Sequence, residues 1–399
     1  MNVRIVSLKR AYERKDLSME TPPVTKKQPL TRFGEFELLK AIAILGLPLV
    51  HVMEEALEAG YASPGLTSFG SAIIGLCAFG PSVFMICMGF GLGGNRTSPA
   101  AIRRNGIQFL LIGAILNVFR WFLPGILSAA VLHTRLIEDI NFCLQSDIYY
   151  FVGLFHIFYS FMKQLKVKTP GLLMISIVML SVNELLRPFT GHITNAIAGS
   201  LLGNIVYVNE TSCFPLLSWA VFPSVGILLG DYLKKSTEEQ REYFMRRTLD
   251  FSAVLFCSFA IFLHSYGIDL MKALVSPANE YITDLPNVIL LLSLALLLIA
   301  LTYYLCKKIG ASSFMAFMLR ISAFIIPFYL TQWIIIAWIF YLLPILHAPK
   351  GCFTLLHFFV TVIAVMIVCI FISTRYGMKI MKLLLKITTF KKRKKKKAK

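Results

Sequence analysis

The feature that most constrains this chain is the length of its apolar runs, most of which extend over roughly 17 to 25 residues. A helix needs about 20 apolar residues to cross about 30 Å of hydrocarbon, and these runs match that length. Charged residues make up 15% of the chain, well below the share of about a quarter that is typical of soluble domains. The short alternating strands of a membrane barrel do not appear in the sequence. The sequence therefore predicts an all-α, polytopic membrane helix bundle.

We predict about ten spans in this bundle. They are expected at residues 36–54, 69–93, 105–127, 147–164, 170–187, 214–233, 248–268, 286–306, 321–343 and 353–374. The segment 192–207 is short and polar for a span, and we expect it to lie along the outer surface. The chain is thus divided into a basic N-terminal segment (1–35), a transmembrane domain (36–375) and a Lys-rich tail (376–399).

The basic residues predict the orientation of the bundle. With both termini inside the cell, all but five of the 40 Lys and Arg residues fall on the cytoplasmic side, the exceptions being Arg120, Arg135, Arg187, Lys272 and Lys350. This bias follows the positive-inside rule for an even number of spans. We therefore expect a multi-pass protein of the cell membrane, plasma or inner, with both termini in the cytoplasm.

The basic run KKRKKKKAK follows Phe390 at the end of the chain. Blocks of like charge are usually solvated, and we expect this one to lie against anionic headgroups of the inner leaflet. Nucleic acid is not an expected partner, because no interleaved aromatic residues or recognition fold accompany the basic run.

Two polar residues of the first predicted span, Lys40 and His51, are candidates for a catalytic or binding role. They are eleven residues apart, which places them on nearly the same face of a helix and about 16 Å apart along its axis. Histidine accepts and returns protons near neutral pH, so His51 is a candidate general base at the mouth of a membrane cavity. The alternatives are an interfacial histidine that bonds to headgroups and a lysine that snorkels to the interface.

The stretch from Arg32 through Glu37 and Lys40 to His51 resembles the opening signature of the transmembrane acyltransferase superfamily. This superfamily includes acyltransferase family 3 and the heparan-α-glucosaminide N-acetyltransferase-like proteins, and its signature is a basic residue, ten further residues and a histidine. The chain has Lys40 where Arg is more usual, Glu37 where Asp is usual, and Ala41 where Gly is common. The segments 80–90, 103–104, 147–154 and 214–230 are also similar to the family.

The resemblance implies an enzyme with an acyl-CoA donor in the cytoplasm, with acetyl-CoA the expected co-substrate, and an acceptor hydroxyl or amine on an extracytoplasmic glycan or other envelope component. By resemblance His51 is the catalytic residue, and Lys40, Arg103 and Arg104 would meet the phosphates of the donor. Ordinary topogenic charge is the alternative for the two arginines. The resemblance leaves open whether the acyl group passes through a covalent histidine or is transferred directly. No permanently bound cofactor and no metal site are expected.

Other polar residues within spans are costly in lipid and are therefore candidates for function. We expect Glu37, Arg120 and Asp147 to line the substrate pocket, and Gln332 is a further polar residue within a span. Contacts that hold helices together are the alternative role for such residues.

Two other functions stay open at this point. A secondary transporter or exporter would use a His and Lys pair for substrate and proton coupling, although the chain has no internal repeat. A catalytically silent relative would keep the same fold without transfer.

Overall fold

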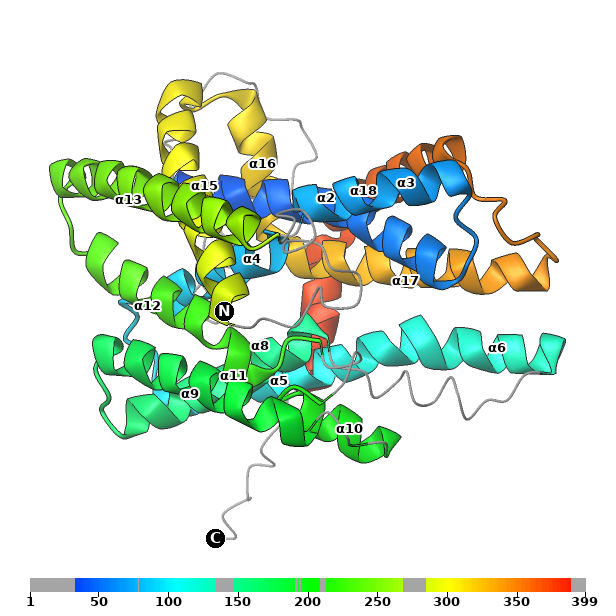
Figure 1. Cartoon of the computed structure of the whole chain (residues 1–399), viewed down its shortest axis with the longest axis horizontal. Helices are drawn as coiled ribbons and strands as arrows, with labels where there is room; N and C mark the ends of the chain where they lie inside the picture. Colours follow the sequence, from blue (N-terminus) through cyan, green and yellow to red (C-terminus); the bar gives the residue numbers. More distant parts are fainter. Residues whose placement is uncertain are drawn as a thin grey trace, which may run out of the picture.

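The computed structural model describes residues 33–77, 79–133, 147–190, 193, 195–208, 213–267 and 285–388. Its helices are α2 (Gly34–Glu58), α3 (Pro64–Cys77), α4 (Gly80–Leu92), α5 (Pro99–Asn117), η1 (Val118–Phe122), α6 (Leu123–Leu132), α8 (Ile148–Gln164), α9 (Thr169–Thr190), α10 (Ala196–Gly203), α11 (Leu216–Trp219), α12 (Val221–Leu233), α13 (Glu238–Ser265), α15 (Leu285–Ile309), α16 (Ser313–Ala323), α17 (Ile325–Ile345) and α18 (Leu355–Thr388). Figure 1 shows their arrangement. In these ranges the β structure is a single isolated bridge, between Ala62 and Phe353, which confirms the all-α prediction. Most of the predicted N-terminal segment and the basic run after Phe390 lie outside the described residues.

The helices match the predicted spans. Within the described chain, nine helical segments are long and apolar enough to cross a membrane. In addition, α8 has 17 residues and a length of about 25 Å, at the lower limit for a span. Each of the ten predicted spans thus corresponds to a helical segment of a multi-pass membrane protein. The segment 192–207 contains only the eight residues of α10, about 12 Å long, which is too short to cross.

Two predicted boundaries are corrected by the structure. The predicted span 321–343 begins too early, because α16 ends at Ala323 and a separate helix, α17, follows. Pro327 explains the break, since a proline ring clashes with the carbonyl four residues before it, here that of Ala323. The last helix, α18, also continues to Thr388, past the predicted end at residue 374.

The first span, α2, lies at the centre of the bundle. It packs against α3, α4, α15, α16, α17 and α18. Most of its side chains are buried, and it remains one helix across Pro48. Polar residues on α2 are therefore surrounded by protein rather than lipid.

Glycines allow two helix pairs to approach closely. On α4 and α12, a Cβ at Gly89 would overlap the carbonyl of Pro223, and one at Gly226 would overlap the carbonyl of Ile86. On α5 and α8, a Cβ at Gly106 would lie 2.7 Å from the carbonyl oxygen of Gly153. Small residues at such crossings are typical of membrane helices, which gain van der Waals contact when their backbones are close. The second crossing fixes α5 against α8, and both helices lead into the site described below.

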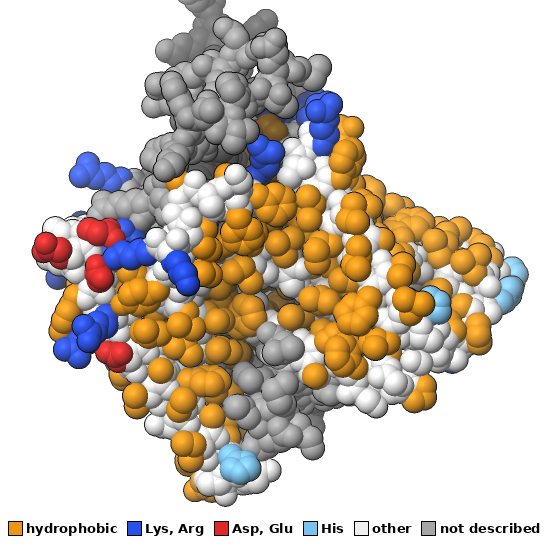
Figure 2. Space-filling view, turned by 90° about the horizontal axis from the view of Figure 1, so that it is seen from above, with side chains coloured by type: hydrophobic (Ala, Val, Ile, Leu, Met, Phe, Trp, Pro, Cys, Tyr) orange, Lys and Arg blue, Asp and Glu red, His pale blue; other side chains and the backbone are white. Residues whose placement is uncertain are grey.

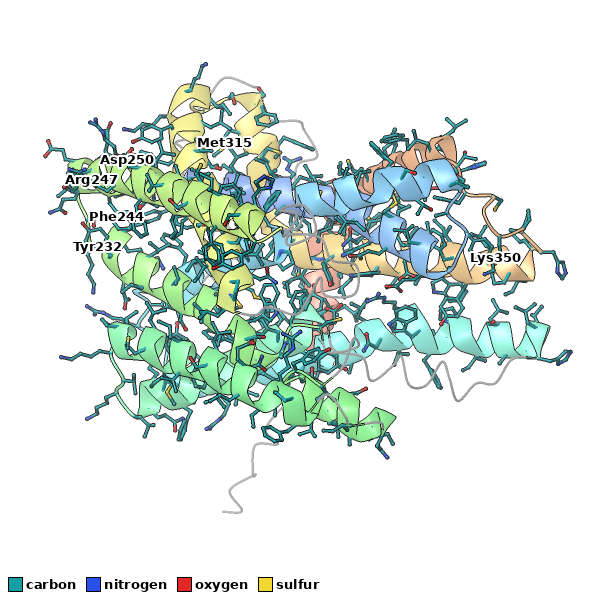
Figure 3. All side chains as sticks on the ribbon, viewed as in Figure 1. Tyr232, Phe244, Arg247, Asp250, Met315 and Lys350 are labelled. Atoms are coloured by element: carbon teal, nitrogen blue, oxygen red, sulfur yellow. The ribbon has the colours of Figure 1, made fainter. Side chains whose placement is uncertain are left out.

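The two ends of the bundle differ in composition. Figure 2 shows charged side chains at the left and upper edges of one face, histidines at the right and lower edges, and a broad hydrophobic band between them. Figure 3 places Lys350 at the end opposite Tyr232, Phe244 and Arg247. The end that holds Arg247 corresponds to the predicted cytoplasmic side, and the end that holds Lys350 to the predicted outer side.

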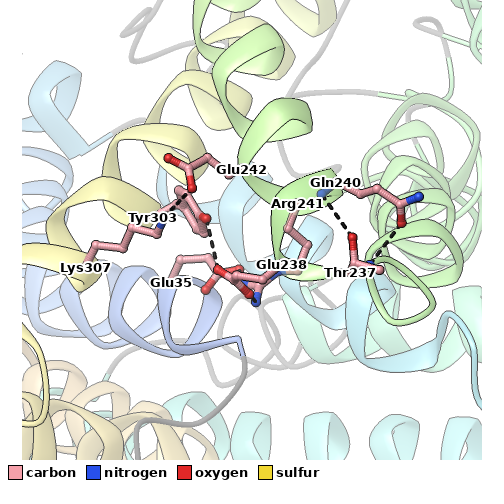
Figure 4. A network of polar contacts seen from close by, with 8 residues as sticks. All are labelled: Glu35, Thr237, Glu238, Gln240, Arg241, Glu242, Tyr303 and Lys307. Atoms are coloured by element: carbon pink, nitrogen blue, oxygen red, sulfur yellow. Dashed lines mark hydrogen bonds and ion pairs between the residues drawn. The ribbon is translucent and has the colours of Figure 1, made fainter.

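An ion-pair network ties the start of α2 to α13 and α15 at the predicted cytoplasmic end (Figure 4). The Arg241 guanidinium lies 3.0 Å from Glu35 and 2.7 Å from Glu238, and Tyr303 donates a hydrogen bond to Glu238. Arg241 and Glu35 are both buried, so each charge needs the other as a partner. This network was not predicted from the sequence, and it anchors the helix that carries His51.

Candidate active site

His51 faces α17 from the outer half of α2. Its ring stacks on that of Trp333, with centroids 3.8 Å apart and an interplanar angle of 21°. The amide Nε2 of Gln332 lies 3.2 Å from His51 Nδ1. His51 is 6% exposed and Gln332 is 0% exposed, so water screens this contact weakly. The imidazole is therefore held in one orientation by two neighbouring residues of one helix.

The Arg120 side chain extends from the π-helical turn η1 toward the Trp333 ring that stacks on His51. Pro124 follows Arg120 by four residues, and its ring would clash with the Arg120 carbonyl in a regular α-helix. The chain adopts the wider turn, in which the N–H of Leu123 donates to the carbonyl of Val118. Single π turns inside helices are frequent at functional sites. The turn sets the direction in which Arg120 leaves the helix.

The Arg120 guanidinium contacts one aromatic ring and two carboxylates of neighbouring elements. Its central carbon lies 3.3 Å from the centroid of the Trp333 ring. Its Nη2 atom lies 3.4 Å from Glu55 Oε1, and its Nη1 atom lies 3.6 Å from Asp147 Oδ2. Glu55 is one turn beyond His51 on α2, so Arg120 joins α2, α8 and α17.

Asp147 caps α8 and also contacts two residues of the candidate site. As the N-cap of α8, its Oδ1 accepts a hydrogen bond from the backbone N–H of Tyr149 at 3.1 Å. Its Oδ2 accepts a hydrogen bond of 2.9 Å from the Tyr329 hydroxyl. Asp147 is therefore a fixed, buried carboxylate whose charge is balanced by Arg120.

We call these residues the outer cluster; it consists of His51, Glu55, Arg120, Asp147, Tyr329, Gln332 and Trp333. Three of its buried polar atoms, Arg120 Nε, Gln332 Oε1 and Trp333 Nε1, have no hydrogen-bond partner among the described residues. Leaving such an atom unpaired costs about 1 to 3 kcal/mol, so paired partners are the rule in protein interiors. These unpaired atoms lie next to the candidate base, where water or a bound molecule would supply their partners.

The structure brings together some of the predicted site residues and separates others. His51, Arg120 and Asp147 meet in the outer cluster. Glu37, also predicted for the substrate pocket, does not, because it is fourteen residues before His51 on α2, about 21 Å along the axis. It accepts a hydrogen bond of 2.6 Å from Ser322 and lies 3.0 Å from the Nζ atom of Lys40.

The predicted donor-binding residues lie near the other end of the bundle. Arg103 and Arg104 are exposed in the first turns of α5. Lys40 is largely buried and paired with Glu37, so the two arginines are the more accessible cations of this predicted set.

Sequence reasoning missed three members of the outer cluster. Tyr329 and Trp333 resemble the ordinary aromatic residues of an apolar span. Only the position of Tyr329, three residues before Gln332 and four before Trp333, links them to a polar site. Glu55 could have been predicted from the sequence, since it lies one turn from His51 on the same face of the helix. In the part of the chain that the structure describes, no group of three or more His, Cys, Asp or Glu residues is arranged to hold a metal ion.

Comparison with known proteins gives one informative result. No curated protein and no solved structure matches the chain. Residues 33–374, however, match a protein family described as an acyltransferase domain. The match covers most of the chain and all of the outer cluster, and it confirms the resemblance seen at the first span. The chain therefore belongs to the acyltransferase 3 family of membrane acyltransferases.

Proposed function

We propose that this protein moves an acyl group, in the first instance acetyl, from cytoplasmic acyl-CoA to a hydroxyl or amine of an extracytoplasmic glycan or other envelope acceptor. We place it in the plasma or inner membrane. The observation that carries the proposal is His51, buried and oriented by Gln332 and Trp333 in a cluster that contains unpaired polar atoms.

His51 acts in this proposal as the general base. A side-chain amide can present either its oxygen or its nitrogen to a histidine ring. With the carbonyl oxygen of Gln332 turned to the ring, that oxygen accepts the Nδ1 proton. The Nε2 atom then keeps its lone pair, which is the form of imidazole that accepts a proton from an attacking hydroxyl.

In the proposed reaction, the acyl group passes directly from the thioester to the acceptor hydroxyl. The acceptor hydroxyl gives its proton to His51 while its oxygen bonds to the thioester carbonyl carbon. The carbon–sulfur bond of the thioester then breaks, and the leaving thiolate takes the proton back from His51. The products are the acylated acceptor and free CoA thiol.

Arg120 is suited to stabilise the negative charge that develops on the thioester oxygen. Glu55, Asp147 and the Trp333 ring fix its guanidinium, while its Nε atom lacks a partner among the described residues. Donors that are fixed before the reaction stabilise developing charge without the cost of reorganisation. Asp147 and Glu55 are positioning residues in this scheme, since they act through Arg120.

Donor binding is proposed at the cytoplasmic end. The exposed Arg103 and Arg104 side chains would pair with the donor phosphates, since guanidinium groups bind phosphate with paired hydrogen bonds. Lys40 lies between this end and His51, and we propose that it contributes positive charge along the path of the donor.

The first test is acetyl-CoA turnover by the purified protein, followed as release of free thiol with crude envelope glycan as acceptor. We expect His51→Ala to lower turnover by about 100-fold or more, because it removes the base. The matched control is His264→Ala, an exposed histidine of α13 that is remote in sequence and outside the outer cluster. Full activity in His51→Ala would contradict the proposed role. No thiol release by the wild-type protein with several donors and acceptors would instead favour transport.

A further inference from the structure

The loop between α4 and α5, residues 93–98, leads directly into the helix that carries the proposed donor cations. Lys163, near the end of α8, donates hydrogen bonds of 3.0 Å to the carbonyl of Asn95 and 2.9 Å to the carbonyl of Thr97. These two carbonyls flank Arg96. The backbone on both sides of Arg96 is therefore held by one side chain of a neighbouring helix.

Other contacts fix the start of the same loop. The backbone N–H of Gly94 donates a hydrogen bond to the carboxylate of Asp231 on α12. Gly94 has a φ of +66°, a left-handed conformation that glycine adopts without steric cost. A Cβ at Gly93 would lie 2.3 Å from the carbonyl oxygen of Ile227, so the loop backbone packs directly on α12. A loop fixed in this way loses little conformational freedom when it binds a ligand.

Arg96 is the one charged residue of this loop. Its side chain is exposed, and the ion pairs found among the described residues at this end of the bundle do not include it. A guanidinium group binds phosphate through paired, charge-assisted hydrogen bonds. The loop therefore presents a phosphate-binding group at the predicted cytoplasmic surface.

Contacts with α8 show how far Arg96 lies from the outer cluster. Asp147, which belongs to the outer cluster, caps the start of α8. Toward the other end of α8, Ser160 donates a hydrogen bond of 2.8 Å to the carbonyl of Pro99, the first residue of α5. Lys163, which holds the loop, is sixteen residues beyond Asp147, about 24 Å along the axis. Arg96 therefore lies beyond the start of α5, farther from the outer cluster than the two arginines of that helix.

The groups of an acyl-CoA molecule follow one another in a matching order. The thioester is at one end, the pantetheine arm and the diphosphate follow, and the ribose with its 3′-phosphate is at the other end. With the thioester at the outer cluster and the diphosphate at the arginines of α5, the 3′-phosphate lies beyond the start of α5. We infer that Arg96 binds this 3′-phosphate and selects CoA over carriers that lack it. This inference rests on the proposed function, since it names a specificity residue for the donor of the same reaction.

CoA and dephospho-CoA differ only in the 3′-phosphate and therefore isolate this contact. The readout is the dissociation constant of each ligand for the purified protein in detergent, measured by isothermal titration calorimetry, which requires no acceptor. We expect the wild-type protein to bind CoA at least about tenfold more tightly than dephospho-CoA, because the phosphate adds charge-assisted hydrogen bonds. The preference should decrease as salt is raised, since exposed charges are screened.

Substitutions of Arg96 test which residue provides the preference. Arg96→Gln should weaken CoA binding by about tenfold and leave dephospho-CoA binding unchanged, so that the preference disappears. Arg96→Lys keeps the charge without the planar guanidinium, and it should retain part of the preference. Arg246→Gln, at an exposed position of α13, is the control and should leave both dissociation constants unchanged.

The outcomes separate the inference from the function on which it rests. Equal affinity of the wild-type protein for the two ligands, or a preference that survives in Arg96→Gln, would overturn the inference and leave acyl transfer intact. Arg96 would then serve only the orientation of the chain in the membrane. A preference for CoA that depends on Arg96, together with no thiol release from acetyl-CoA, would support the contact and contradict acyl transfer. Absence of binding by either ligand would overturn both.

Discussion

At the scale of single residues, the proposed chemistry depends on the contact between Gln332 and His51. Both side chains are buried, and their polar atoms are 3.2 Å apart. A buried histidine can take two neutral forms, and the hydrogen bond at one nitrogen determines which form is present. Gln332 is therefore a positioning residue for the proposed base.

Changing Gln332 tests this role. Gln332→Leu should lower kcat by about tenfold to 100-fold, because the ring loses the partner that fixes its orientation. Gln332→Glu should retain more activity but shift the acidic limb of the pH–rate profile to higher pH by about one unit. The added carboxylate favours the protonated imidazole, so the base becomes free only at higher pH.

The measurement is kcat across a pH series for both variants. Gln164→Glu, at an exposed position at the end of α8, is the matched control and should leave the profile unchanged. A merely structural role for Gln332 would lower activity equally at every pH, and an unshifted profile in Gln332→Glu would contradict the positioning role.

At the scale of elements, the segment α5–η1–α6 links the two ends of the protein. It carries Arg103 and Arg104 near its start and Arg120 in its π turn, sixteen residues after Arg104 and about 24 Å along the axis. One continuous helical segment thus holds the proposed donor cations at one end and the proposed oxyanion donor at the other.

Because donor binding and catalysis are assigned to different parts of this segment, substitutions in the donor-binding part should change KM rather than kcat. The double variant Arg103→Gln and Arg104→Gln should raise KM for acetyl-CoA by about tenfold with little change in kcat, because it removes contacts made equally before and during the reaction. Initial rates over a range of acetyl-CoA concentrations measure this. Arg246→Gln, an exposed arginine of α13 at the same end, is the control. An unchanged KM in the double variant would place the donor phosphates elsewhere.

The positions of the helices were predicted better than the contacts between them. The length of the apolar runs was sufficient to locate the helices, because lipid requires about 20 apolar residues per span. The break between α16 and α17 was missed although Pro327 marks it, since α16 is itself apolar. Tyr329 and Trp333 were missed for a different reason: their contacts with Asp147, His51 and Arg120 depend on how α17 packs against other helices, which local sequence does not encode.

At the scale of the whole molecule, the outer cluster and the exposed arginines of α5 lie toward opposite ends of one bundle. The basic residues predicted a difference between the two ends, and Figure 3 shows Arg247 and Lys350 at opposite ends of the bundle. The orientation in the membrane remains a prediction from the positive-inside rule. A transfer that begins with a cytoplasmic donor and ends on an outer acceptor requires that orientation and a path along α2 between the ends.

The most direct test of this account uses sealed vesicles that contain the purified protein, with acetyl-CoA enclosed inside and chitotriose only outside. We expect acetylated chitotriose to accumulate outside and CoA thiol to accumulate inside, with both signals lost in His51→Ala. Product formation only when donor and acceptor are on the same side of the membrane would contradict the account.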